Sequence, residues 1–208
     1  ADAACGTASA SPTLTAGQGS LTLYLLARRA GTATLHASPS DSTPPVTQAL
    51  IVNPSSASKL AVPNAPLALL TTQTCSPGTL QVQLRDQFDN ATTMSTPLAV
   101  RVSVTGLTDV RFAEGADTTC AVPATDFTLP ANASSLFLRA AATSATGTMG
   151  TVRVAPTAAP TITAATQDLF VATGPPARFT WDGQAQSPLA GVCSANPLTI
   201  RLTDATDN

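Results

Sequence analysis

The chain of 208 residues has little charge and few lysine, histidine or aromatic residues, and each shortage argues against a class of function. Charged residues make up 11% of it, against about 25% in an average soluble domain. Because the net charge is −2 and no basic cluster occurs, neither nucleic acid nor an anionic membrane surface is an expected partner. No apolar run approaches the ~20 residues of a membrane-spanning helix, so we expect no membrane insertion in this segment.

Catalytic signatures are also missing. The one histidine, His36, has no visible acid or nucleophile partner, and no G-x-S-x-G turn accompanies the many serines. No glycine-rich phosphate loop occurs. The four cysteines show no C-x-x-C spacing and cannot complete a zinc site with a single histidine. The sequence therefore predicts a protein that is not an enzyme and has no cofactor, apart from one Ca²⁺ alternative.

Short runs in which apolar and polar residues alternate fill most of the chain. Residues 80–84, 98–104 and 152–154 follow a period of two, which is typical of a strand with one face buried. Breaks containing Pro, Gly or Asn separate the runs, and no stretch carries apolar residues at helical spacing. Further strand candidates are residues 67–71, 110–113, 127–129, 135–140, 161–164 and 168–172. The expected fold is all-β, an antiparallel sandwich of two sheets.

The sequence repeats itself over the length of a whole domain. Residues 75–90 return as residues 193–208, and the shared Cys, Ser, Leu, Asp and Asn all keep an offset of 118 positions. Cys5 and the residues after it match Cys120 and its followers at an offset of 115. A period this long is a domain rather than a solenoid repeat. We therefore expect three parts: the rear of one repeat at 1–57, a complete repeat at 58–174, and the front of the next at 175–208.

The cysteines divide according to this repeat. Cys75 and Cys120 lie 45 residues apart within the complete repeat, so we predict a disulfide between them and an oxidising compartment. Cys5 and Cys193 are each half of an equivalent bridge, unpaired in this segment or paired outside it. A Cys5–Cys193 bond between neighbouring chains is the remaining alternative, although the joined halves would lack a counterpart of residues 91–115.

The strand and turn at residues 80–90 resemble a known family. Leu80-x-Val82-x-Leu84-x-Asp86-x-Phe88-Asp89-Asn90 is similar to the V-x-V-x-D-x-x-G-N signature of bacterial immunoglobulin-like domains in invasin-like and related surface proteins. The Cys-Ser lead-in and the edge at residues 128–138 look like tandem repeats of large secreted proteins of myxobacteria. The resemblance covers the complete repeat and both partial ones, and implies tandem immunoglobulin-like sandwiches that act as spacers, stalks and adhesive arms. The usual glycine is Asp89 here, and we expect Asp to tolerate its left-handed turn position.

The same turn is the one candidate metal site. Asp86, Asp89 and Asn90 present oxygens that Ca²⁺ accepts, although a complete site needs further acids, such as Asp109, Glu114 or Asp117. The alternative is an Asx-type turn that closes a strand. Trp181, the only tryptophan, follows the Pro175-Pro176 linker, and we expect it to pack at a domain junction rather than to stack on carbohydrate.

Short linkers containing proline join the repeats, and proline restricts the freedom of adjacent domains. The predicted function is a structural or adhesive repeat module of a secreted or cell-surface bacterial protein, which forms an extended stalk or filament. Its expected partners are neighbouring copies of the same repeat and other subunits of a filament or surface assembly. Two alternatives stay open: a module that binds glycan or protein through its loop tips, and spacer domains of a large secreted enzyme.

Overall fold

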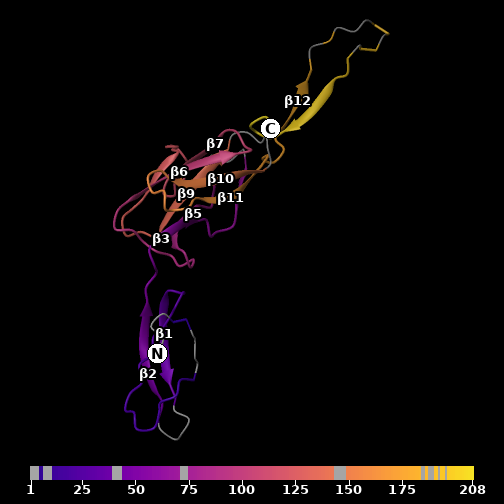
Figure 1. The fold of residues 1–208 in the computed structure, drawn as a ribbon. Helices are drawn as coiled ribbons and strands as arrows, with labels where there is room; N and C mark the ends of the chain where they lie inside the picture. Colours follow the sequence, from indigo (N-terminus) through magenta and orange to yellow (C-terminus); the bar gives the residue numbers. More distant parts are fainter. Residues whose placement is uncertain are drawn as a thin grey trace. The chain divides into compact units, whose positions relative to one another are not determined.

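The computed structural model describes residues 5–6, 11–38, 44–70, 75–142, 149–183, 186, 190–191, 193–194 and 196–208. Its regular elements within these ranges are β-strands, which confirms the all-β class (Figure 1). In chain order they are β1 (Gly31–Ala37), β2 (Val46–Val52), β3 (Ala57–Ala61), β4 (Leu67–Leu70), β5 (Leu80–Asp86), β6 (Leu98–Thr105), β7 (Val110–Glu114), β8 (Asp126–Leu129), β9 (Ser135–Ala142), β10 (Met149–Pro156), β11 (Ala165–Ala172), β12 (Arg178–Asp182) and β13 (Thr199–Thr203). Within the described residues, no helix has the length and hydrophobicity to cross a bilayer.

The contacts divide the chain into two units. The first contains Ala1–Ser55 together with Phe88–Asn90, and the second contains Ser56–Gln87 and Ala91–Asn208. Among its described residues, the first unit has one antiparallel sheet, in which Gly31 of β1 lies opposite Val52 of β2. The division into three repeats at 1–57, 58–174 and 175–208 stays a prediction.

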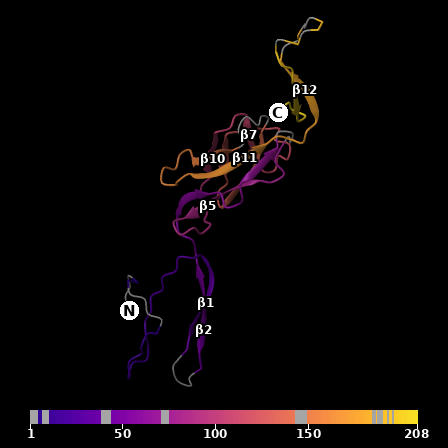
Figure 2. The same ribbon diagram turned by 90° about the vertical axis from the view of Figure 1, so that its right-hand side faces the viewer.

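The second unit contains the sandwich. One sheet has the strand order β4-β11-β10-β6-β8, and the other has the order β3-β5-β9-β7. Figure 2 shows β10 and β11 beside each other, and they pair antiparallel, as do most neighbours in both sheets. The exception is β4, which runs parallel to β11 with Leu67 opposite Leu169.

The alternating runs place their apolar residues between the two sheets. In β5, Leu80, Val82 and Leu84 are buried while the intervening Gln and Arg residues are partly exposed. In β6, Leu98, Val100 and Val102 are buried in the same way, with exposed residues between them. These side chains belong to one core cluster that both sheets supply, and burying each one stabilises the sandwich by about 1.5–3 kcal/mol.

Most predicted strands are present, with boundaries moved by up to three residues, but one prediction was wrong. Residues 161–164 form no strand; Thr163 makes only an isolated bridge to Lys59, while the strand begins at Ala165 and runs as β11. The short Ala run at 140–142 is buried at the end of β9, with Ala140 and Ala142 in the core cluster and Ala141 beside Ala113 and Cys120.

The hairpin β12–β13 has the same strand register as β3–β5. Phe179 lies opposite Leu202, as Leu60 lies opposite Leu84, and each pair is the counterpart of the other in the sequence repeat. The two hairpins differ in burial: Leu84 is 0% exposed, whereas Leu202 is 56% exposed. The same local sequence pattern therefore forms the same hairpin, once with its apolar face covered and once with that face open.

Candidate functional site

The predicted disulfide between Cys75 and Cys120 is present, with 5.3 Å between the two Cα atoms. Cys120 is buried beside Ala113 and Ala141, and its backbone is left-handed, with φ at 51°. Cys5 and Cys193 are free, Cys193 being exposed and Cys5 partly buried. Cys5 adopts the same unusual backbone as its counterpart Cys120, with φ at 52°.

A polar network fixes the loops around the disulfide. The Arg139 guanidinium donates hydrogen bonds to the carbonyl oxygens of Gly115 and Pro77, each at 2.9 Å. Ser76 exchanges backbone and side-chain hydrogen bonds with Ala140, with the Ser76 N–H donating at 2.7 Å. Because every one of these groups is paired with backbone, the network holds structure rather than a reacting group.

The Asp117 carboxylate closes the loop that leads to Cys120. It accepts hydrogen bonds from the N–H of Val122 at 3.0 Å and from the N–H and hydroxyl of Thr119 at 3.1 and 2.8 Å. These donors, with Val122 the largest cause, hold the pKa of Asp117 below its ordinary value, because they favour the charged carboxylate. The oxygens of Asp117 are therefore used within its own loop.

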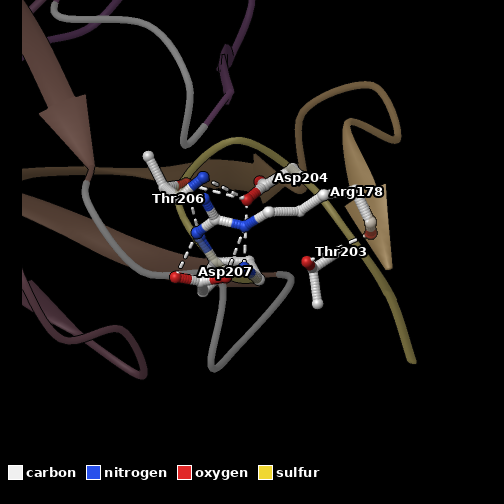
Figure 3. Close-up of polar contacts among 6 residues, drawn as sticks. Arg178, Thr203, Asp204, Thr206 and Asp207 are labelled. Atoms are coloured by element: carbon white, nitrogen blue, oxygen red, sulfur yellow. Dashed lines mark hydrogen bonds and ion pairs between the residues drawn. The ribbon is translucent and has the colours of Figure 1, made fainter. Parts of the chain in front are cut away.

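The turn after β13 shows how an aspartate organises the end of a strand (Figure 3). Asp204 is only 2% exposed. Its Oδ1 accepts hydrogen bonds from the N–H groups of Thr206 and Asn208 and from the Thr206 hydroxyl, at 2.8–3.0 Å. Its Oδ2 accepts the N–H of Gly174 at 2.9 Å, which joins the turn to the linker before β12. Hydrogen bonds to four donors offset the cost of burying this carboxylate.

Aspartate is tolerated at the turn position that glycine usually takes, as predicted. Asp89 has φ at 69° and Asp207, its counterpart, has φ at 65°, so both turns survive with aspartate in the left-handed conformation. The Asp207 carboxylate faces Arg178, which donates from Nε at 2.9 Å and forms a second contact through its terminal nitrogen (Figure 3). This two-contact pairing is the geometry in which arginine binds carboxylate best.

In the first unit, the Asn90 side chain hydrogen-bonds to the backbone as a neighbouring strand would. Its Oδ1 accepts the N–H of Ala30 and its Nδ2 donates to the carbonyl of Arg28, both at 2.8 Å. The Arg28 guanidinium also lies 5.9 Å from the centre of the Phe88 ring, within cation–π range. Phe88–Asn90 thus belongs to the first unit by specific contacts, although β5 directly before it belongs to the second.

The counterpart turn at Asp204 has the hydrogen bonds of an Asx-type turn, and the Ca²⁺ alternative at residues 86–90 stays a prediction. Among the described residues, no three His, Cys, Asp or Glu side chains gather where they could hold a metal ion. Asp86 is fully buried, Asp89 is exposed, and the Asn90 carboxamide bonds to backbone.

We expect Ca²⁺ to leave the stability of the protein unchanged. A site with a dissociation constant of ~10 μM would add about 2.7 kcal/mol at 1 mM Ca²⁺, which raises the melting temperature by several degrees. Thermal unfolding in 1 mM CaCl₂ and in EDTA should therefore agree within about 1 °C. A Ca²⁺-dependent rise that disappears in Asp89→Asn would show that the turn binds metal after all.

His36 does not take part in any catalytic arrangement that the structure describes. It is exposed on β1, in the first unit. A cavity of about 350 Å³ lies where β10 turns into β11, lined mostly by Ala and Pro between Arg153 and Ala164. Its lining offers a single ionisable side chain, so it brings no acid, base and nucleophile together.

The feature that sequence reasoning missed is the open apolar face of β12–β13. Five side chains on one side of this hairpin are 55–74% exposed, namely Phe179, Trp181, Leu198, Ile200 and Leu202. Trp181 was expected at a domain junction, and this expectation is wrong for the described structure, because Trp181 is 70% exposed and lies opposite Ile200. The alignment of the two repeats could have revealed this apolar face, because the residues of β5 that correspond to those of β13 are core residues, namely Leu80, Val82 and Leu84.

Comparison with known proteins gives no family. No protein-family model matches the chain, and no curated protein matches it. Among solved structures, a β-glycosidase from Bacteroides vulgatus is similar at 10% sequence identity and a TM-score of 0.42. The match covers 68% of this chain and 17% of that protein, so the chain corresponds to less than a fifth of its length.

Proposed function

We propose that the chain is a non-enzymatic structural or adhesive module of a secreted or cell-surface protein, built from immunoglobulin-like sandwiches that follow one another in a stalk or filament. The observation that carries the proposal is the recurrence of one hairpin and one turn at a distance of 118 residues. In the hairpin β3–β5, Lys59 lies opposite Arg85, and the equivalent pair in β12–β13 is Arg178 and Thr203. Each hairpin is followed by a turn that contains an aspartate with positive φ.

Two further features support a mechanical role outside the cytoplasm. The Cys75–Cys120 disulfide crosslinks loops of the sandwich, and such bonds persist in oxidising compartments. The buried Asp204 accepts a hydrogen bond from Gly174 in the linker, so the turn of one repeat restrains the chain between repeats. A restrained linker and a crosslinked sandwich suit a stalk that has to resist extension and proteolysis.

Electron microscopy of the intact oxidised protein tests the proposal. Strands rise about 3.3 Å per residue, so sandwiches with strands of about eight residues should appear as beads spaced roughly 30 Å apart, plus the length of their loops. The Asp204→Ala variant is the matched comparison, because it removes the linker hydrogen bond and should give strings that bend more. A compact globular particle would contradict the stalk, and hydrolysis of a glycan or peptide bond by the purified chain would contradict the non-enzymatic role.

A further inference from the structure

The outer face of the sheet β3-β5-β9-β7 carries an excess of positive charge. Residues directly opposite each other in a ladder point to the same side of a sheet, so the strand register defines this face. Lys59 lies opposite Arg85, and Arg139 lies opposite Ala113. The outward positions of these four strands, all of which the structure describes, hold no Asp or Glu and four cations, namely Lys59, Arg85, Arg111 and Arg139. We call this surface the cationic face.

The outer face of the other sheet shows no such excess. On β6 and β8, Arg101 pairs with Asp126 at 2.8 Å. On β10 and β11, Asp168 lies opposite Thr151, two residues from Arg153. Cations and carboxylates are therefore balanced on that sheet, and they are separated on the cationic face. Because the net charge of the chain is −2, an anionic ligand is attracted to such a local face and not to the protein as a whole.

An exposed aromatic ring lies within the cationic face. Phe137 on β9 is 48% exposed and lies opposite Gln81 on β5. The Gln81 Nε2 donates a hydrogen bond to the Ser135 hydroxyl at 3.1 Å, which holds the amide beside the ring. Gly115 donates its N–H to the Phe137 carbonyl at 2.8 Å, and a Cβ at position 115 would lie 2.9 Å from the Phe137 Cβ. Glycine thus allows this close approach and adds no side chain beside the ring.

Two arginines follow Phe137 along the same face. Arg139 is the next outward residue of β9, and its guanidinium donates to the backbone carbonyl oxygens of the disulfide loops. These acceptors are neutral, so they fix the position of Arg139 and leave its positive charge in place. Arg111 on the neighbouring strand β7 is exposed and lies opposite Ala141, two residues beyond Arg139.

The acidic residues close to these arginines in the chain do not point to the cationic face. Glu114 lies opposite Leu138, a core residue, and therefore belongs to the other side of β7. Asp117 uses both carboxylate oxygens within its own loop, where they accept hydrogen bonds from Thr119 and Val122.

We propose that the cationic face binds an acidic polysaccharide, whose sugars carry carboxylates as uronic acids do. One sugar ring stacks on Phe137, and the Gln81 amide bonds a hydroxyl of that sugar. Arg111 binds a carboxylate, with Arg139 adding positive charge beside it, because guanidinium and carboxylate match in shape and charge. Arg85 lies four residues from Gln81 along β5, about 13 Å away at the usual rise of a strand. A linear ligand that follows β5 and β9 therefore meets cations on both sides of the ring.

The side chains between the cations favour a polysaccharide over a nucleic acid. Gln81, Gln83 and Ser135 carry amide and hydroxyl groups, which suit the many hydroxyls of a sugar chain. Single-stranded nucleic acid is held by stacking successive bases on several aromatic rings, and Phe137 is the one aromatic residue at the outward positions of these strands. The inference goes beyond the proposed function, because it assigns a ligand to a sheet face and does not depend on how the modules follow one another.

Affinity electrophoresis of the oxidised chain tests the proposal. In native gels that contain sodium polygalacturonate, the chain should be retarded in proportion to the amount of polysaccharide, which gives a dissociation constant. Gels with the neutral polysaccharide dextran should not retard it. Retardation should weaken as NaCl is raised from about 50 to about 500 mM, because salt screens exposed charges.

Two matched pairs of variants locate the site. Phe137→Ala is compared with Phe170→Ala, since the two rings are 48% and 42% exposed on the outer faces of different sheets. Arg111→Gln is compared with Arg153→Gln, because both arginines are exposed and only Arg111 lies on the cationic face. We expect Phe137→Ala and Arg111→Gln each to raise the dissociation constant at least about fivefold, and the two controls to change it by less than about twofold.

Urea unfolding shows whether each variant is folded before its binding is compared. Should Phe137→Ala fail to fold, Phe137→Leu takes its place, since it keeps an apolar side chain and removes the ring. Arg111→Gln changes an exposed residue and tests the same site independently.

Four results would overturn the inference. They are no retardation by polygalacturonate, equal retardation by dextran, equal losses in the variants and their controls, and binding of an oligothymidylate as tight as that of polygalacturonate. A loss in Arg111→Gln without one in Phe137→Ala would also overturn it, because attraction between charges alone needs no ring. Each of these results leaves the stalk untouched, whereas a compact particle in the microscope would reject the stalk and leave the cationic face.

Discussion

Replacing both Cys75 and Cys120 by alanine is expected to lower the free energy of unfolding of the second unit by about 4 kcal/mol. The bridge closes a loop of 45 residues, and in the chain-entropy account a loop of this length restrains the unfolded chain by roughly that amount. Alanine is the suitable replacement because Cys120 is 2% exposed and a serine hydroxyl there would add the cost of burying a polar group.

Urea unfolding monitored by far-ultraviolet circular dichroism measures this loss. The control is Cys193→Ala, which removes an exposed free thiol and should change the free energy by less than about 0.5 kcal/mol. Adding reductant to the native protein should reproduce the loss seen in the double variant. If the double variant were within about 1 kcal/mol of the native protein, the disulfide would not be the main restraint on the unfolded chain.

Shortening Leu84 to alanine is expected to cost about 3 kcal/mol, whereas the same change at Leu202 should cost less than about 0.5 kcal/mol. The two leucines occupy the same place in the repeat, on β5 and β13, and their strand registers agree. Leu84 is 0% exposed and its loss leaves a cavity in the core, while Leu202 is 56% exposed.

The two variants carry the same substitution at equivalent positions of the repeat, and the two positions differ in burial. Urea unfolding of the oxidised chain at low protein concentration, where copies stay apart, gives both values. A loss above 1.5 kcal/mol in Leu202→Ala would contradict the open face, because it would mean that something covers β13 in the monomer.

The sequence predicts features that local chemistry determines. Alternation over residues 80–84 places Leu80, Val82 and Leu84 in the core, since side chains on a strand point to opposite faces. The left-handed turn at Asp89 follows from the tolerance of aspartate for that conformation. The pairing of Cys75 with Cys120 follows from spacing and the lack of a zinc-ligand set.

Features that depend on pairing between segments far apart in the chain could not be predicted from the sequence. Residues 161–164 have a strand-like composition, but Thr163 only bridges Lys59 while β11 begins after it. The exposure of Trp181 depends on whether a second sheet covers β12, and no sequence pattern near Trp181 indicates whether such a sheet is present. Asn90 was one of the candidate Ca²⁺ ligands, and its carboxamide bonds to the backbone at Arg28 and Ala30, a contact with a distant segment that the local sequence does not indicate.

The parallel pairing of β4 with β11 sets the order of events during synthesis. Leu67 leaves the ribosome about a hundred residues before its partner Leu169, and so long a separation makes the pairing slow to form. Until β11 arrives, Leu67 and Leu69 have no strand beside them, and the five-stranded sheet lacks one edge. Cys75 and Cys120, by contrast, are both available well before β11 is made. The covalent crosslink can therefore form first, and the sandwich is completed last, when β11 pairs with β4.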